Sequence, residues 1–323
     1  MLEELVQIGV KAETTEGTYN APLVADAALL VRDPKYEIIN PKMDRQVRSA
    51  AFSNWNSIGR QIGAQISFDM DLYAVDKTTK PKWDILFQAC GLIATGGAGS
   101  PWVYGLVSAK ASIPAVSISF NKDGYLRKIA GCRGAVKFKM VAGMPVVASF
   151  TFKGAHVAPT DTAFLAPTFD TTSKDLPAFV GAAVALTHVS PATDDLTTSE
   201  AVLETLEIDL GNEIFLSPSA NSSTGFLSTT VVNRDPKIMI DPEMTSVSAF
   251  DWLSNLKNDY AFTFTTGVMS AQTALNTIKF DAPNLQFYEW TEENRGGIAV
   301  AKAGFRCRRS VADNDELTIT LSS

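Results

Sequence analysis

The sequence contains few residues of the kinds that most often carry catalysis or bind metals. Its 323 residues include two histidines, His156 and His188, and neither has a cysteine or a second histidine at the spacing of a zinc site. The cysteines, Cys90, Cys132 and Cys307, are odd in number and scattered, which fits a reducing compartment better than a disulfide framework. No serine lies in a nucleophile-elbow sequence. We therefore expect no metal, no cofactor and no enzymatic activity.

The sequence also lacks a long apolar run and an excess of basic residues. Its most apolar segment is residues 178–186, whereas a membrane-spanning helix needs about 20 residues. The start, Met1–Glu4, has neither the basic residues nor the apolar run of a signal peptide. The 28 basic and 35 acidic residues give a net charge of -7, which disfavours a dedicated nucleic-acid-binding protein. We expect a soluble protein with no membrane partner.

Three short clusters have residues that could bind or act on a ligand, and each has a simpler explanation. The glycines of residues 95–99 lack the lysine and the following helix of a phosphate-binding loop. Residues 313–316 are acidic but lack the spacing of a calcium loop, and they are typical of a turn. Asp69 and Asp71 could be a glycosidase pair, although alternation along a strand would give the same two residues on a solvated face. None of the three predicts an active site.

The dominant pattern is an alternation of apolar and polar residues, which predicts half-buried antiparallel strands. Residues 62–72 are the clearest case, with apolar residues at even positions and polar residues at most odd positions. Shorter stretches of the same kind are residues 116–120, 136–140, 148–153, 206–210, 262–265 and 317–321. The run Asn-Lys-Asp-Gly at 121–124 predicts a hairpin turn between two strands. The chain is therefore predicted to be mainly β.

The chain divides into two similar halves. Its length suits two domains, and residues 159–195, with four prolines, are typical of a connector. Apolar residues at helical spacing predict one short helix at 82–90 and another at about 248–256. Each helix follows a strand, loop and strand, and precedes further strands. We predict two tandem β-domains, residues 1–165 and 166–323, each flanked by one short helix.

Residues 129–159, which begin Ile-Ala-Gly-Cys-Arg-Gly-Ala-Val, resemble a stretch of the tail tube proteins of long-tailed bacterial viruses, "GARGNV-F-L-AGEP--LSF-F-G---AP". Residues 11–19 resemble the N-terminal "KEETTYGT" of that family, and residues 82–91 resemble its "W-dLL-acG" helix. In the second half, residues 208–212 resemble its "iDlGN" strand and residues 314–319 its closing "gnDel-I" strand. The resemblance therefore covers most of the chain.

The resemblance implies a β-sandwich or barrel domain, repeated twice here, whose strands join those of neighbours into a continuous barrel. It implies a structural virion protein that is no enzyme: stacked rings form the hollow tail tube that conducts the viral genome into the host. The implied partners are copies of itself, a tape measure protein, tail terminator and tip proteins, and viral DNA in non-specific transit. The implied location is the virion tail, after assembly in the cytoplasm of the host bacterium.

Two other function classes remain open at this point. One is a carbohydrate- or receptor-binding β-sandwich of a virion, which needs an exposed aromatic platform. The candidates for that platform are Trp55, Trp102 and Trp290. The other class is a hydrolase on a β scaffold, which the missing pair of nucleophile and base disfavours.

The resemblance and the repeated halves lead to three expectations about assembly. Tail tubes of single-domain subunits form rings of six, so a chain with two such domains can form a pseudo-hexameric ring as a homotrimer. A polar loop at residues 41–59 is expected to contact the adjacent ring through Phe52, Trp55, Arg45 and Arg48. Polar strand faces are expected to line the lumen with rings of carboxylates, so that DNA meets no fixed counter-charge to bind. The expected lumen residues are Gln65, Ser67, Asp69, Asp71, Glu207 and Asp209.

Overall fold

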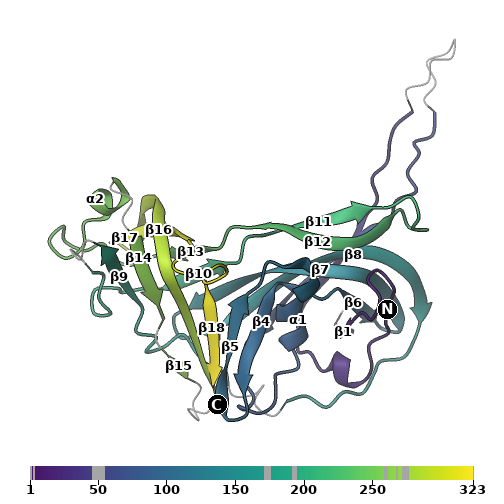
Figure 1. Ribbon diagram of the computed structural model, residues 1–323, viewed down its shortest axis with the longest axis horizontal. Helices are drawn as coiled ribbons and strands as arrows, with labels where there is room; N and C mark the ends of the chain where they lie inside the picture. The colour runs from purple at the N-terminus through teal and green to yellow at the C-terminus, as the bar shows by residue number, and fades with distance from the viewer. Residues whose placement is uncertain are drawn as a thin grey trace.

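The computed structural model describes residues 2, 4–45, 55–170, 176–190, 195–257, 261–266, 268–270 and 276–322. The fold is mainly β, as predicted, and its strands form one large antiparallel sheet with two short helices beside it (Figure 1). The predicted hairpin turn is present, since Asp123 and Gly124 both have positive φ angles between consecutive strands.

The elements of the two halves follow one another in a similar order. The first half contains β1 (Val6–Ala12), β2 (Arg32–Ile39), β3 (Gly63–Asp71), α1 (Asp84–Ala89), β4 (Leu92–Gly97), β5 (Ser100–Leu106), β6 (Val116–Lys122), β7 (Tyr125–Val141) and β8 (Val147–Asp161). The second half contains β9 (Ala185–Ser190), β10 (Thr205–Asp209), β11 (Asn212–Pro218), β12 (Phe226–Arg234), β13 (Lys237–Ile240), α2 (Trp252–Lys257), β14 (Ala261–Thr265), β15 (Met269–Ser270), β16 (Thr277–Arg295), β17 (Ile298–Cys307) and β18 (Thr318–Ser322). Single 3-10 turns lie at Ala25–Ala27 and Lys110–Ser112.

Strands of both halves belong to one 16-stranded sheet, and β11 and β12 form a separate two-stranded sheet. The central part of the large sheet has the order β2-β3-β8-β7-β10-β13-β17-β16 and continues through β18 and β5 to β4. Within this order each half contributes four strands, and the four follow the same pattern. The two strands before the helix lie next to each other, and the two strands of the later hairpin follow in reverse order. We call these eight strands the inner sheet.

One face of the inner sheet is apolar and covers the core. In β3, Ala64, Ile66, Phe68 and Met70 are buried, because side chains alternate between the faces of a strand. In the first half, helix α1 lies against this face and its Phe87 packs on Phe138 of β7.

The cores of the two halves meet beneath the sheet. Phe138 of the first half packs on Phe280 of the second, with ring centroids 5.2 Å apart. In the second half, Trp252 of α2 packs on Phe287, which stacks on Phe305. Helix α2 therefore has a similar place to α1, against the later hairpin of its own half.

Candidate assembly interface

The two halves of the chain join by direct strand pairing. The end of β7 pairs with β10 in an antiparallel register that runs from Val141 opposite Thr205 to Lys137 opposite Asp209. Thus the last inner-sheet strand of the first half pairs with the first inner-sheet strand of the second half. We call this contact the internal junction. It buries Ile208 of β10 completely, beside Phe138.

The two outermost strands of the inner sheet, β2 and β16, have edges without a strand neighbour in the described part of the chain. The corresponding edges of β10 and β7 pair with each other at the internal junction. In the described part of the chain, β2 has β3 as its only hydrogen-bonded neighbour, and residues 287–295 of β16 pair on one side only, with β17. Strand β2 is the counterpart of β10, and β16 is the counterpart of β7. Ile38, which like Ile208 is the second-to-last residue of its strand, is 61% exposed. A large apolar side chain on an open strand edge indicates a missing neighbour.

The second face of the inner sheet is polar and includes all six predicted lumen residues. On β3, Gln65, Ser67, Asp69 and Asp71 alternate with the buried core residues. Directly opposite residues in neighbouring strands share a face, which allows rows to be followed across the sheet. One row runs from Asp69 through Ser149 of β8 and Lys137 of β7 to Asp209 of β10. The next row runs from Asp71 through Val147 and Lys139 to Glu207.

Lysine and arginine side chains lie between these carboxylates. Asp209 is 2.7 Å from the ammonium of Lys137, Glu207 is 3.5 Å from that of Lys139, and Asp71 is 2.7 Å from the guanidinium of Arg32. The polar face therefore carries fixed cations beside its carboxylates. The alternation within one strand reveals its own face, but the opposite charges come from neighbouring strands that are distant in sequence.

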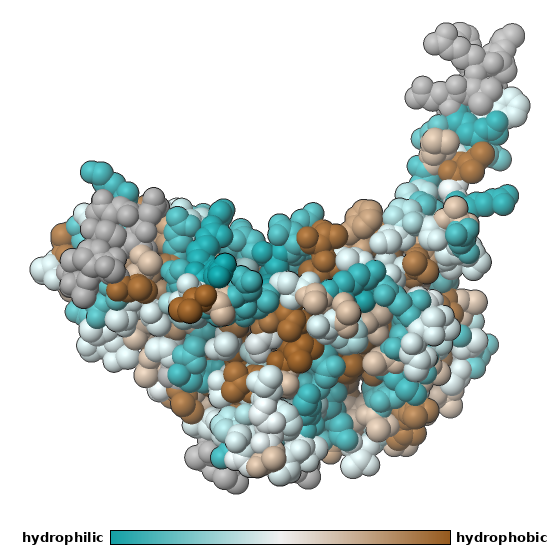
Figure 2. All heavy atoms as spheres, in the orientation of Figure 1, coloured by the Kyte–Doolittle hydropathy of each residue, from teal (hydrophilic) through white to brown (hydrophobic). Residues whose placement is uncertain are grey.

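A long connection between β2 and β3 extends away from the body of the molecule (Figures 1 and 2). We call residues 40–62 the arm. Its two legs run side by side, since the backbones of Met43 and Ile58 exchange two hydrogen bonds of 2.9 Å. Gly59 allows this close approach, because a Cβ atom there would lie 2.4 Å from the carbonyl oxygen of Pro41.

The arm exposes apolar side chains beside basic ones. Met43, Trp55 and Ile58 are 69%, 50% and 49% exposed, and the guanidinium of Arg45 lies 5.8 Å from the ring centre of Trp55. These side chains contact little of their own chain, which fits a surface that meets a partner. The other two predicted contact residues, Phe52 and Arg48, lie outside the described residues.

Comparison with known families agrees with this architecture. The family model described as phage tail tube protein matches residues 4–299, which is most of the chain. The chain belongs to the phage tail tube protein family. It is a structural component of the virion tail, and the resemblance found in the sequence is confirmed. No curated protein matches the chain.

The three candidate tryptophans of this tail tube protein have different surroundings. Trp102 lies on β5, where its indole N–H donates to the carbonyl of Asp76 and its ring covers Gly97. Trp290 packs against the buried core from β16. Of the three, Trp55 of the arm is the strongly exposed one. The three lie on separate elements, and Trp102 and Trp290 are engaged within the chain.

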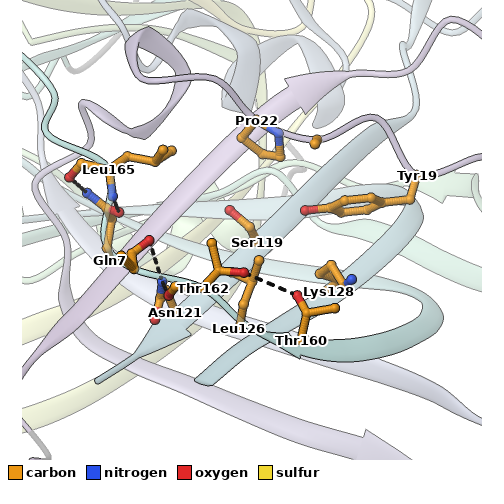
Figure 3. A pocket seen from close by; sticks show the side chains of 12 residues that line it. Gln7, Tyr19, Pro22, Ser119, Asn121, Leu126, Lys128, Thr160, Thr162 and Leu165 are labelled. Atoms are coloured by element: carbon orange, nitrogen blue, oxygen red, sulfur yellow. Dashed lines mark hydrogen bonds between the residues drawn. The ribbon is translucent and has the colours of Figure 1, made fainter. Parts of the chain in front are cut away.

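The first-half surface of this tail tube protein contains a cavity of about 280 Å³ between β1, β6, β7 and β8 (Figure 3). Two of its polar side chains are bonded within the protein: the amide of Gln7 exchanges two hydrogen bonds with the backbone of Leu165, and Asn121 donates to the carbonyl of Thr162. In the described ranges, no group of three or more His, Cys, Asp and Glu residues could hold a metal ion. The helices of the same ranges include none long and apolar enough to cross a membrane.

Proposed function

We propose that this tail tube protein assembles into rings of three chains, which stack into the hollow tube that conducts the viral genome into the host cell. The observation that carries the proposal is the internal junction. One chain contains two inner-sheet units of the same strand order, joined edge to edge, with free edges of the same kind at both ends. The units correspond to domains of residues 1–165 and 166–323.

Ring closure would repeat the internal junction between chains. The free edge of β16 would pair with β2 of the next chain, and Ile38 would become buried as Ile208 is now. A heterologous contact of this kind generates a closed ring when the rotation fits. Three chains of two units give six units in a pseudo-hexameric ring with a mass of 3 × 34.8 = 104.4 kDa.

The polar face of the inner sheet would line the channel, because the apolar face is already covered by the core. This face carries the proposed lumen residues Gln65, Ser67, Asp69, Asp71, Glu207 and Asp209. Lys137 and Lys139 of this face contact carboxylates, which makes them less available to phosphates. DNA could then pass without being held, since non-specific DNA affinity depends on the number of phosphates that cations neutralise.

Removing the carboxylates of β10 tests the placement of this face. In virions with Glu207→Gln and Asp209→Asn, the tail should form, but Lys139 and Lys137 lose their partners. Genome release triggered in vitro should slow, and added salt should restore part of the rate, because salt weakens phosphate binding. Asp313→Asn, which frees Arg309 outside the inner sheet, is the control. Normal release from normal tails in the double variant would contradict a lumen position.

The proposal also assigns the surroundings of the tube. The arm, through Arg45, Arg48, Phe52 and Trp55, would contact the adjacent ring. A tape measure protein, tail terminator and tip proteins would be further partners in the tail, with assembly in the host cytoplasm and no catalytic step.

Electron microscopy of the purified protein tests the assembly directly. The proposal predicts rings or tubes with a central channel. Compact monomers that bind glycans would instead support the alternative, a carbohydrate- or receptor-binding protein of the virion. Trp55→Ala with Phe52→Ala should block tube formation and leave the subunit folded by circular dichroism.

A further inference from the structure

The strand register places the arm and the tight hairpin turns at opposite ends of the inner sheet. The arm leads into β3 at Gly63, which pairs with Ala155 of β8, whereas Asp71 at the far end of β3 pairs with Val147, next to the β7–β8 turn. The β16–β17 turn, at residues 296–297, lies at that same far end, because β17 pairs antiparallel with β13. When rings stack in one direction, the arm of one ring faces the end with the turns in the next ring.

Only one of the two units of the chain has a free arm in the described structure. The counterpart of the arm in the second half is the hairpin of β11 and β12, which lies over β7 and β8 of the first half (Figure 1). The tip of that hairpin bonds the base of the arm, since Ile62 donates to the carbonyl of Thr224 over 2.9 Å. The hairpin is therefore used within the chain, and the arm is the element available for a neighbour.

The described part of the arm carries an excess of positive charge around its apolar side chains. The exposed charged residues in 40–45 and 55–62 are Lys42, Asp44, Arg45 and Arg60, which is three cations and one carboxylate, or a net charge of +2. Any surface that receives this arm should therefore be apolar at its centre and acidic around it.

The second half has such a surface beside the β16–β17 turn. Val202, Met244 and Ile298 are 48%, 37% and 49% exposed, and backbone hydrogen bonds from Glu243 to Val202 and from Met244 to Ala299 hold their segments together. We call this the turn surface.

Acidic side chains border the turn surface. The guanidinium of Arg295 lies 3.5 Å from Glu204, 3.3 Å from Asp241 and 3.5 Å from Glu243. Three carboxylates around one guanidinium leave a net charge of -2, opposite in sign to that of the arm.

The equivalent end of the first half is covered by its own chain. Beside the β7–β8 turn, Gly143 donates to the carbonyl of Phe179, and Pro145 forms a β-bridge with Ala178. The turn itself, residues 142–145, is Ala-Gly-Met-Pro and carries no charge. Met144 remains 58% exposed there. Asp71 at the base of this turn is paired with Arg32, and Glu204, whose backbone carbonyl accepts from Ala142, belongs to the acidic border of the turn surface.

We infer that the arm of each chain docks on the turn surface of a second copy of this chain in the adjacent ring, and not on the first-half turn. This contact distinguishes the two units from each other. It fixes the rotation of one ring on the next, with a first half above a second half. This inference rests on the proposed tube and adds its stacking register.

A pair of engineered cysteines tests the docking. The native cysteines, Cys90, Cys132 and Cys307, are buried and will not compete for oxidation. Tubes assembled under reducing conditions from the Met43→Cys, Ile298→Cys double variant should form disulfides between chains on mild oxidation. The matched control is Met43→Cys with Met144→Cys, which has an equally exposed partner on the first-half turn. We expect at least a tenfold higher yield of cross-linked chains in the first variant.

The pattern of products distinguishes contacts between rings from contacts within one ring. Each chain gives one arm and receives one, so docking between rings yields a ladder of cross-linked chains that extends beyond three. A ladder that stops at three would place the contact within a ring and overturn the inference. Equal or greater cross-linking through Met144→Cys, or no cross-linking of either pair in intact tubes, would overturn it as well. Absence of tubes in the wild-type protein would instead contradict the proposed function.

Discussion

At the scale of single residues, Arg133 and Glu16 connect the two halves of the chain. Arg133 is 3% exposed, and its guanidinium donates to the carboxylate of Glu16 over 2.9 Å and to the carbonyls of Ile113 and Thr229. Ser228 of β12 donates to the same carboxylate. These bonds tie the N-terminal loop of the first half to the hairpin of the second. The hydrogen bond from Arg133 is the main reason that the pKa of Glu16 falls from 4.5 to about 2.

The pKa of Glu16 predicts how stability depends on pH. A depressed pKa in the folded state contributes stability above about pH 4.5, and that contribution is lost as the pH falls toward 2. Glu16→Gln should therefore reduce the free energy of unfolding by about 1–2 kcal/mol at pH 7, after allowance for solvent screening. Urea titrations of the unassembled subunit at pH 7 and pH 3 should show the difference shrinking at pH 3. An equal difference at both values would contradict the account, and Glu293→Gln on the surface is the control.

Gly211 has a structural role in the run Asp-Leu-Gly-Asn, residues 209–212, which resembles the family strand. Its φ is +64°, and a Cβ atom there would lie 2.1 Å from the carbonyl oxygen of Asp235. The next residue, Asn212, donates to the carbonyls of Cys90 and Gly134. The glycine thus allows the chain to leave β10, and the asparagine fixes the start of the hairpin on the first half.

Gly211→Ala should lower the free energy of unfolding by at least about 2 kcal/mol, because both the backbone conformation and the close contact oppose a side chain. Gly296→Ala is the matched control. Its φ is +61° as well, but no atom lies within 4 Å of the added methyl group, so we expect a loss of about 1 kcal/mol. Chemical denaturation of the subunit measures both values, and similar losses in the two variants would contradict the role of the close contact.

At the scale of elements, the sequence predicts where single strands and helices lie better than it predicts which strands pair with one another. The predicted strand at 62–72 is β3 at Gly63–Asp71, and the predicted helix at 82–90 is α1 at Asp84–Ala89. The spacing of apolar residues in each is a local signal, because burial of one face requires apolar residues at the period of the strand or the helix. The pairing of β7 with β10 joins residues more than 60 positions apart and leaves no periodic signal in either strand.

The hairpin of β11 and β12 shows the same limit. Serine-rich residues 217–226 suggest a loop, yet the flanking residues form two strands that lie over the first half. Strand β11 is the run Asn-Glu-Ile-Phe-Leu-Ser-Pro, which has consecutive apolar residues instead of alternation. The ion pairs on the polar face could likewise not be predicted from the sequence, because the two residues of each pair lie on different strands.

Ile38 provides a test of the free edge of β2. Ile38→Lys places a charge where the proposed ring buries an apolar side chain, and it should prevent ring formation while the subunit stays folded, because Ile38 is 61% exposed in the isolated chain. Val311→Lys, at an 86% exposed residue outside the inner sheet, should assemble normally. Size-exclusion chromatography with light scattering separates monomers from rings. Rings of normal mass formed by the Ile38 variant would contradict a closure through β2.

At the scale of the whole molecule, the described chain contains two inner-sheet units of the same strand order, with an unpaired strand edge at each end of the inner sheet. The internal junction and the shared core contact of Phe138 with Phe280 join the units firmly. The arm and the hairpin of β11 and β12 make them unequal. A tube of such chains should therefore have threefold symmetry that only approximates sixfold symmetry in its inner sheet.

A cryo-electron microscopy map of the assembled tube tests this central claim most directly. The account predicts three chains in each ring, with β16 of one chain paired to β2 of the next and the polar face of the inner sheet toward the channel. Six chains in each ring, with the second half decorating the exterior, would contradict it.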